Sequence, residues 1–345
     1  MSRSRMEKAI SARLRELAGA VAQTAMGTWR FTIANGRRLP AEARLGGGWL
    51  CLATIPGPAA EFASHWEMLA ANAALPGLAK LALDPMTGQP QLRAEAPVET
   101  DADCLEQLAA ACAGFERGVI LLSPAGAGNQ RETAAAFMAE VSERVGDIPR
   151  PVSTAATSMG RNRAESRSAT ATEDALPATA MVGAELAELC AEAGWQPLRH
   201  DDDGCIVQLE STRTPLSARL SARAGGLRAR AELLGCGPLK PPSRAALARL
   251  LLAAGGSVRM VRASVDANGD GPSAGIEVIC GPRPSPAFVG HALASLSLVA
   301  RLAAAESQAL ADPSMARRYL RMQERATTMT PSTSISRSNE SGERP

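Results

Sequence analysis

Hydrophobic and polar residues follow one order of patterns in the first part of this chain and repeat it in the second. The first part opens with a helical pattern, in which apolar residues recur every three or four positions: Met6, Ile10, Leu14, Leu17 and Val21. The second part opens with a similar pattern: Val182, Leu186, Leu189 and Ala193. We expect the first helix to end near Gly27 and the second at Gly194. Trp29 and Trp195 then each begin an extended segment.

Each part continues with a hairpin at a glycine turn. In the second part, apolar and polar residues alternate over residues 216–233 on both sides of Gly225 and Gly226. Strict alternation predicts two strands with one buried face and one solvated face. The first part has the same arrangement over a shorter range, residues 41–52, around three consecutive glycines.

A middle helix, a second hairpin and a long closing helix complete each part. The second hairpins turn at Asp84 and Asp266. The closing helices carry regularly spaced apolar residues: Leu105, Leu108, Cys112 and Phe115 in the first part, and Phe288, Ala292, Leu296, Val299 and Leu302 in the second. The offset in numbering between the parts grows only modestly from the tryptophans to these hairpin turns, as loop insertions in a duplicated unit would produce.

This order of elements predicts an α+β fold of two similar units, each an antiparallel sheet with helices on one face. Each unit runs helix, hairpin, helix, hairpin, helix. We assign the first unit to residues 1–148 and the second to residues 179–326. Residues 149–178 are rich in Ser, Thr, Ala and Arg and lack apolar periodicity, which predicts a disordered linker. Residues 327–345 have the same character and are expected to form a disordered tail.

The composition narrows the classes of protein that fit. A chain of 345 residues that is 46% hydrophobic is long enough for two domains with cores of their own. Aromatic residues make up only 3%, so we expect cores of Ala, Leu and Val and no stacking platform for bases or sugars. The net charge of only +2 is too small to attract a highly charged partner by overall charge alone.

Cysteine usage bears on the compartment. The seven cysteines are scattered, without a Cys-x-x-Cys pair, which indicates buried, reduced thiols and no disulfide framework. Charged residues interrupt the region after the basic N-terminus, so no secretory signal is expected, and the apolar stretches are too short to span a bilayer. We therefore expect a cytoplasmic protein without a membrane partner.

The element order resembles the type III secretion chaperone-like fold, which effector chaperones share with YbjN-type proteins. The features that carry the resemblance are the strand entries at Trp29 and Trp195, the glycine turns, and the closing helices from Leu105 and Phe288. It covers most of the chain as a tandem duplication. The resemblance implies a non-enzymatic module that holds or escorts another protein, such as a secreted effector. Because family members usually pair as homodimers, it also implies a monomer with paired halves, or a homodimer.

A metal site is the alternative that the sequence offers. Asp266, Asn268, Asp270 and Glu277 match the spacing of the oxygen ligands in a calcium loop. The flanking residues predict strands, whereas a calcium loop requires helices, and an Asn-Gly-Asp-Gly run also suits an ordinary hairpin turn. His200 and the three aspartates after it form a second candidate for a metal site or an enzyme, with a polar turn as the simpler interpretation. We expect no cofactor.

Four arginines of the second-part hairpin are expected on one strand face: Arg219, Arg223, Arg228 and Arg230. They form a candidate partner-binding surface, because guanidinium groups bind carboxylates and phosphates. A solvated sheet face is the simpler interpretation. No aromatic residue lies between these arginines, so nucleic-acid binding is the less favoured use. The sequence contains no nucleophile elbow or phosphate-loop signature, and we predict no catalytic residues.

We expect the two halves to pack on each other as an internal pseudo-dimer. The opening and closing helices carry wider apolar stripes than one thin sheet requires. The expected docking surface is apolar and includes some of these residues: Trp29, Trp49, Trp195, Leu216 and Leu220.

Overall fold

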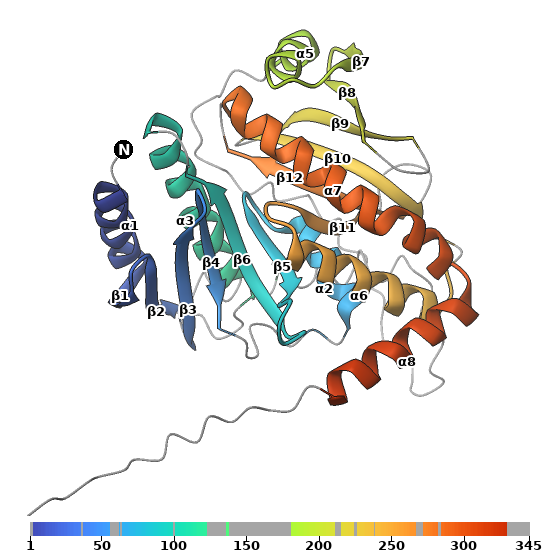
Figure 1. The fold of residues 1–345 in the computed structure, drawn as a ribbon, viewed down its shortest axis with the longest axis horizontal. Helices are drawn as coiled ribbons and strands as arrows, with labels where there is room; N and C mark the ends of the chain where they lie inside the picture. Colours follow the sequence, from blue (N-terminus) through green and yellow to red (C-terminus); the bar gives the residue numbers. More distant parts are fainter. Residues whose placement is uncertain are drawn as a thin grey trace, which may run out of the picture.

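Two six-stranded antiparallel sheets and seven helices make up the described part of the chain (Figure 1). The computed structural model describes residues 3–35, 37–55, 62, 64–98, 101–122, 136–137, 181–210, 215–223, 226–237, 239–266, 272–281 and 284–329. The predicted α+β fold of two similar units is therefore confirmed.

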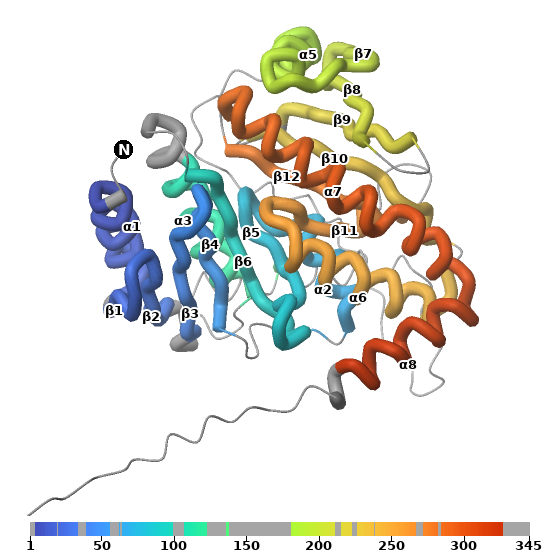
Figure 2. Tube along the Cα trace, viewed as in Figure 1, coloured from blue at the N-terminus to red at the C-terminus, as the bar shows by residue number. Residues whose placement is uncertain are grey.

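Each half contributes one sheet and its helices, and Figure 2 follows the chain from the first half to the second. The first half comprises α1 (Arg3–Leu17), β1 (Ala18–Ala25), β2 (Thr28–Asn35), β3 (Arg37–Gly46), β4 (Trp49–Thr54), α2 (His65–Ala74), β5 (Ala79–Leu83), β6 (Pro90–Pro97) and α3 (Asp101–Leu122). The second half comprises α5 (Gly183–Glu192), β7 (Pro197–Asp201), β8 (Gly204–Leu209), β9 (Leu216–Arg223), β10 (Gly226–Gly235), α6 (Pro241–Ser257), β11 (Arg262–Asp266), β12 (Ser273–Cys280), α7 (Pro286–Leu310) and α8 (Pro313–Met329).

The two sheets have the same topology. Their strand orders are β1-β2-β3-β4-β6-β5 and β7-β8-β9-β10-β12-β11, so every strand of one sheet has a counterpart in the other. The correspondence extends to single residues: Glu95 of β6 lies opposite Cys51 of β4, and Glu277 of β12 lies opposite Arg230 of β10. Element order and strand pairing thus describe one unit that occurs twice.

The expected correspondence of Trp29 with Trp195 is wrong. The first helix ends earlier than its apolar spacing predicts, and residues 18–25 form β1, which pairs with β2. Gly27 turns this hairpin with φ = +69°, a left-handed conformation that glycine adopts without steric cost. Trp29 therefore lies in β2, whose counterpart is β8, whereas Trp195 precedes β7. Pairing with a neighbouring strand overrides a helical spacing in this segment.

The middle helices cross from one half to the other. Helices α1 and α3 pack on the first sheet, and α5 and α7 pack on the second (Figure 1). Among the strands, α2 packs mainly on β11 and α6 mainly on β5, each an inner edge strand of the opposite half. Buried apolar residues of both halves form one continuous cluster, so the expected packing of the halves on each other is confirmed.

One of the predicted docking residues lies at the contact between the halves. The ring of Trp49 stands edge-on to His291 of α7, with the ring centroids 5.9 Å apart. The guanidinium of Arg259 lies 5.2 Å from the centre of the same indole. Trp49 therefore joins β4 to two segments of the second half.

The rest of the contact is more polar than expected. The other four predicted residues lie in or beside strands away from the inner sheet edges: Trp29, Trp195, Leu216 and Leu220. Lys80 and Arg262, by contrast, lie in the inner edge strands and are almost fully buried. Between these strands, the buried Asn72 donates its amide to the carbonyls of Leu81 (2.9 Å) and Ala263 (2.8 Å). Polar side chains thus fix how the two sheet edges meet.

Helix α7 is the one described helix that is long and apolar enough to cross a membrane, and 56% of its most apolar window is buried inside the protein. It packs along β10 and β12, as a core helix does. The predicted linker, residues 149–178, lies outside the described residues. So does the predicted tail, except for residues 327–329, which end α8.

Candidate functional site

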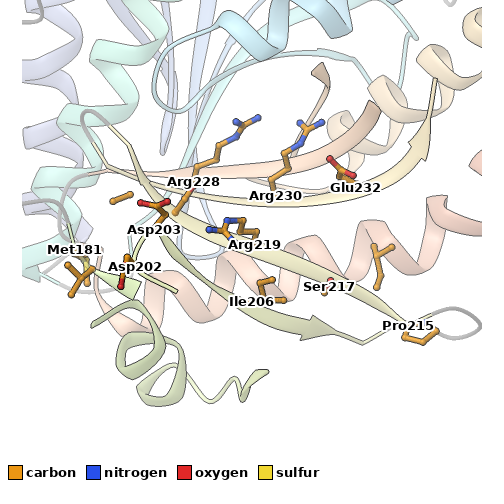
Figure 3. Close-up of a pocket in the computed structure, with 14 residues that line it drawn as sticks. Met181, Asp202, Asp203, Ile206, Pro215, Ser217, Arg219, Arg228, Arg230 and Glu232 are labelled. Carbon is orange, nitrogen blue, oxygen red and sulfur yellow. The ribbon is translucent and has the colours of Figure 1, made fainter. Parts of the chain in front are cut away.

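The arginine-bearing face of the second sheet forms an open concavity of about 840 Å³ (Figure 3). We call it the arginine concavity. Its lining includes apolar residues from the segment before α5, from β8 and from the start of β9: Met181, Val182, Ile206, Pro215 and Leu216. Its charged lining residues are Asp202, Asp203, Arg219, Arg228, Arg230 and Glu232. Figure 3 shows Arg228 and Arg230 side by side on one strand, with Arg219 on the neighbouring strand.

Three of the four predicted arginines therefore meet in one place. Two-residue periodicity along β9 and β10 puts them on one face, and Arg219 is the direct cross-strand neighbour of Arg230. Arg223 ends β9, and its side chain lies outside the described part of the structure.

The floor of the concavity rests on the buried carboxylate of Glu277. Arg262 donates from Nε to Oε1 (2.8 Å), and Arg228 donates from Nε to Oε2. Arg230 Nη1 lies 3.8 Å from Oε2. Arg228 also donates to Asp266 (3.2 Å). In the floor, the guanidiniums of Arg228, Arg230 and Arg262 therefore surround the buried carboxylates of Glu277 and Asp266.

A glycine makes room for one of these guanidiniums. Arg230 lies beside Gly275 of β12, where a Cβ would come within 3.1 Å of the guanidinium carbon. The side chain donates to Ser264 Oγ (2.7 Å) and to the carbonyl of Ser273 (3.2 Å). Hydrogen bonds to β11 and β12 thus hold the Arg230 side chain in place.

Electrostatics keep Glu277 ionised. Burial raises the pKa of this carboxyl, but Arg262, Arg228 and Arg230 outweigh the effect, so its pKa lies below the ordinary value of 4.5. A buried carboxylate with several guanidinium partners remains charged at neutral pH. Glu277 therefore acts as a fixed counter-ion for the arginines.

Arg219 is the most exposed of the three arginines. Its Nη1 and Nη2 donate to the two carboxylate oxygens of Asp201, at 2.9 and 2.8 Å. This is the two-pronged geometry in which arginine binds carboxylates. The side chains of Arg219 and Asp201 are 43% and 54% exposed, so the pair lies at the rim and not in the floor.

Two of the four predicted calcium ligands, Asp266 and Glu277, lie within the described residues. Both carboxylate oxygens of Glu277 accept hydrogen bonds from guanidiniums. Asp266 is buried and pairs with Ser273 across the hairpin of β11 and β12. Asn268 and Asp270 lie outside the described residues. The flanking strands agree with the hairpin interpretation of this segment.

The His200 segment ends β7 and continues into the turn before β8. His200 is exposed, and Asp201 accepts a hydrogen bond from the backbone N–H of Asp203 (3.1 Å), as in an ordinary Asx turn. Among the described residues, no group of three or more His, Cys, Asp or Glu side chains is arranged to hold a metal ion.

The structure contains a second buried ion pair, which the sequence patterns did not predict. Lys80 and Glu95 form an ion pair of 2.6 Å in which both side chains are buried. Lys80 also donates to the carbonyls of Gly255 (2.7 Å) and Val258 (3.1 Å), at the end of α6 in the other half. A lysine within the apolar strand of residues 79–83 is the signal that could have revealed it, because an unpaired buried lysine is rare.

Comparisons of this chain with protein-family models, curated proteins and solved structures found no match.

Proposed function

We propose that this protein is a non-enzymatic binding module that holds a segment of a partner polypeptide in the arginine concavity. The segment carries at least one carboxylate, and it lies along the exposed face of β9 and β10. The observation that carries the proposal is the cluster of three arginines in the concavity, in which Arg219 is about half exposed at the rim while Arg228 and Arg230 are held beside Glu277.

The size and lining of the concavity support a peptide ligand. Its volume of about 840 Å³ lies within the range of ligand-binding sites. Apolar residues such as Ile206 and Leu216 offer contacts for aliphatic side chains, and Asp202 and Asp203 add acidic groups at one side. Alternating side chains of an extended peptide can therefore meet apolar and charged positions in turn.

The resemblance to type III secretion chaperones supports the same class of function. Two copies of one α+β unit, paired within a chain, correspond to the homodimers of that family. On this basis we propose a cytoplasmic protein whose partner is another protein, such as a secreted effector. Nucleic acid is a less suitable ligand, because Arg228 and Arg230 are mostly buried and bonded to protein groups, so they do not form an exposed phosphate track.

The test measures binding of a labelled peptide of alternating glutamate and leucine by fluorescence anisotropy. We expect saturable binding, and roughly two- to fivefold weakening in Arg219→Gln, because an exposed pair of charged groups is lost. A peptide with glutamine in place of glutamate should bind more weakly than the acidic peptide.

The first half supplies a matched control. Arg44 of β3 lies opposite Cys51, which faces Glu95, just as Arg219 lies opposite Arg230, which faces Glu277. The Arg44 side chain is 74% exposed and is paired with Glu42. Arg44→Gln should leave peptide binding unchanged. Equal loss in both variants, or no preference for the acidic peptide, would contradict the proposal.

A further inference from the structure

We infer that Asp201 acts as an internal competitor for the arginine concavity, by occupying on Arg219 the position that a carboxylate of the partner takes. This inference rests on the proposed function. The carboxylate of Asp201 accepts from both terminal nitrogens of Arg219, at 2.8 and 2.9 Å. A glutamate or aspartate side chain of a peptide presents the same two oxygens, so it can replace Asp201 without new geometry.

The position of Arg219 explains why an anion is needed there. Arg219 and Arg230 lie directly opposite each other on β9 and β10. Like charges in this arrangement repel, and a carboxylate beside one of them relieves the repulsion. Arg230 has Glu277 nearby, whereas Arg219 has Asp201. Asp201 therefore supplies to Arg219 the negative charge that a carboxylate of the partner would bring.

The pair is also easy to separate. Both side chains are about half exposed, and ion pairs exposed to water contribute little to stability. Asp201 keeps a partner when it releases Arg219, because the N–H of Asp203 donates to its Oδ1 (3.1 Å). Its release leaves the turn between β7 and β8 with this hydrogen bond intact.

The competition predicts that removing the charge of Asp201 strengthens binding. We expect Asp201→Asn to bind the alternating glutamate–leucine peptide roughly two- to fivefold more tightly than the wild type, the range that exposed ion pairs span. Asp201→Ser should act in the same direction, since its hydroxyl can still accept from Asp203. Affinity for the glutamine–leucine peptide should not change.

Asp203→Asn is the control for general electrostatics. Asp203 lines the concavity two residues from Asp201, and its substitution removes the same charge while leaving the Arg219–Asp201 pair in place. The Kd of each variant for both peptides is measured at pH 7 and constant salt, on full-length protein whose fold is checked by circular dichroism. A larger gain in both Asp201 variants than in Asp203→Asn supports the inference.

If both Asp201 variants bind the acidic peptide no more tightly than Asp203→Asn does, Asp201 is not a competitor, although the binding function stands. If the wild type and the Asp201 variants do not bind the acidic peptide at all, the proposed function fails and the inference fails with it.

Discussion

Lys80 and Arg262 make reciprocal contacts across the interface between the two halves. Lys80 Nζ donates to the carbonyl of Val261, the residue before Arg262, at 3.2 Å. Arg262 Nη1 donates to the carbonyl of Ala79, the residue before Lys80, also at 3.2 Å. Each cation is also paired with a buried glutamate of its own half.

The reciprocity extends to the middle helices. Arg262 donates to the carbonyl of Leu75 at the end of α2 (2.7 Å), and Lys80 donates to that of Gly255 near the end of α6 (2.7 Å). Cations suit these positions, because the last carbonyls of a helix lack partners within the helix and carry partial negative charge. Each half thus supplies the cation that binds the helix end of the other half, as in a twofold dimer interface.

Replacing Lys80 with methionine should destabilise the protein strongly. The substitution leaves the carboxylate of Glu95 buried without its nearest cation, which costs about 3 kcal/mol or more when one partner of a buried pair is lost. Equilibrium unfolding in urea measures the loss. The double variant Lys80→Met/Glu95→Leu should recover much of it, because no buried charge then lacks its partner.

Arg44→Met is the exposed comparison for this experiment. Its side chain is 74% exposed, so its removal should change the free energy of unfolding by less than about 1 kcal/mol. Equal losses of unfolding free energy in Lys80→Met and Arg44→Met would mean that the buried ion pair contributes no more to stability than an exposed one.

Acid should remove the stabilisation that the buried glutamates provide. Guanidiniums hold the folded-state pKa of Glu277 below its ordinary value of 4.5, although burial opposes them. A depressed folded-state pKa gives stability above the unfolded-state pKa, and that stability is lost as the pH falls through the folded-state pKa. The wild type should therefore be more stable than Glu277→Gln at pH 7, and the difference should narrow below about pH 4.5.

Urea titrations of both proteins between pH 7 and pH 3 test this expectation. As the pH falls, the unfolded wild type binds a proton at Glu277 that the folded state does not, so its advantage over the variant shrinks and the two curves approach each other. A difference in unfolding free energy that stays constant over the whole range would show that Glu277 is not an ionised counter-ion in the folded protein.

Gly256→Ala should reverse the usual effect of this substitution in a helix. Alanine normally stabilises a helix by about 1 kcal/mol relative to glycine. Gly256, however, packs on β5, and a Cβ there would lie 1.9 Å from the backbone oxygen of Leu83. We expect the variant to lose at least about 1 kcal/mol of unfolding free energy, since the backbone cannot move aside cheaply.

Gly235→Ala is the control, because a Cβ at this position meets nothing within 4 Å. Thermal melts of both variants should show a lower Tm for Gly256→Ala alone. A Tm for Gly256→Ala at or above that of the wild type would contradict the close approach of α6 to β5.

Local patterns predicted most elements of the fold. The alternation over residues 216–233 predicted the β9–β10 hairpin, because one face of these strands is buried towards α7 and the other faces the concavity. The end of α5 just before Gly194 was predictable for a similar reason, since the φ of +83° at this position favours glycine. Both signals come from neighbouring residues, whereas the missed strand β1 depends on pairing with β2.

The site could be predicted only in part. Periodicity put Arg219, Arg228 and Arg230 on one face, but their different burial depends on β12, which brings Glu277 beneath two of them. No local pattern records that pairing. One usable signal was present. The offset in numbering that relates the two hairpin turns, Asp84 and Asp266, also relates two further charged positions in each half: Lys80 to Arg262 and Glu95 to Glu277. Charged residues repeated within apolar strands mark the interface that apolar spacing alone did not locate.

The interface between the halves should survive cutting of the chain between them. Residues 1–148 and 179–326, expressed as separate fragments, contain both inner edge strands and the reciprocal contacts of Lys80 and Arg262. Burial of the apolar cluster that both halves share should drive the fragments to associate. The contacts of the buried cations should fix how the two inner edge strands align. We therefore expect a one-to-one complex by size-exclusion chromatography, and a weaker complex when the first fragment carries Lys80→Met.

Arg44→Met in the same fragment should leave association unchanged. Two soluble, folded fragments that remain separate at tens of micromolar, roughly the range of weak transient interfaces, would refute the pseudo-dimer.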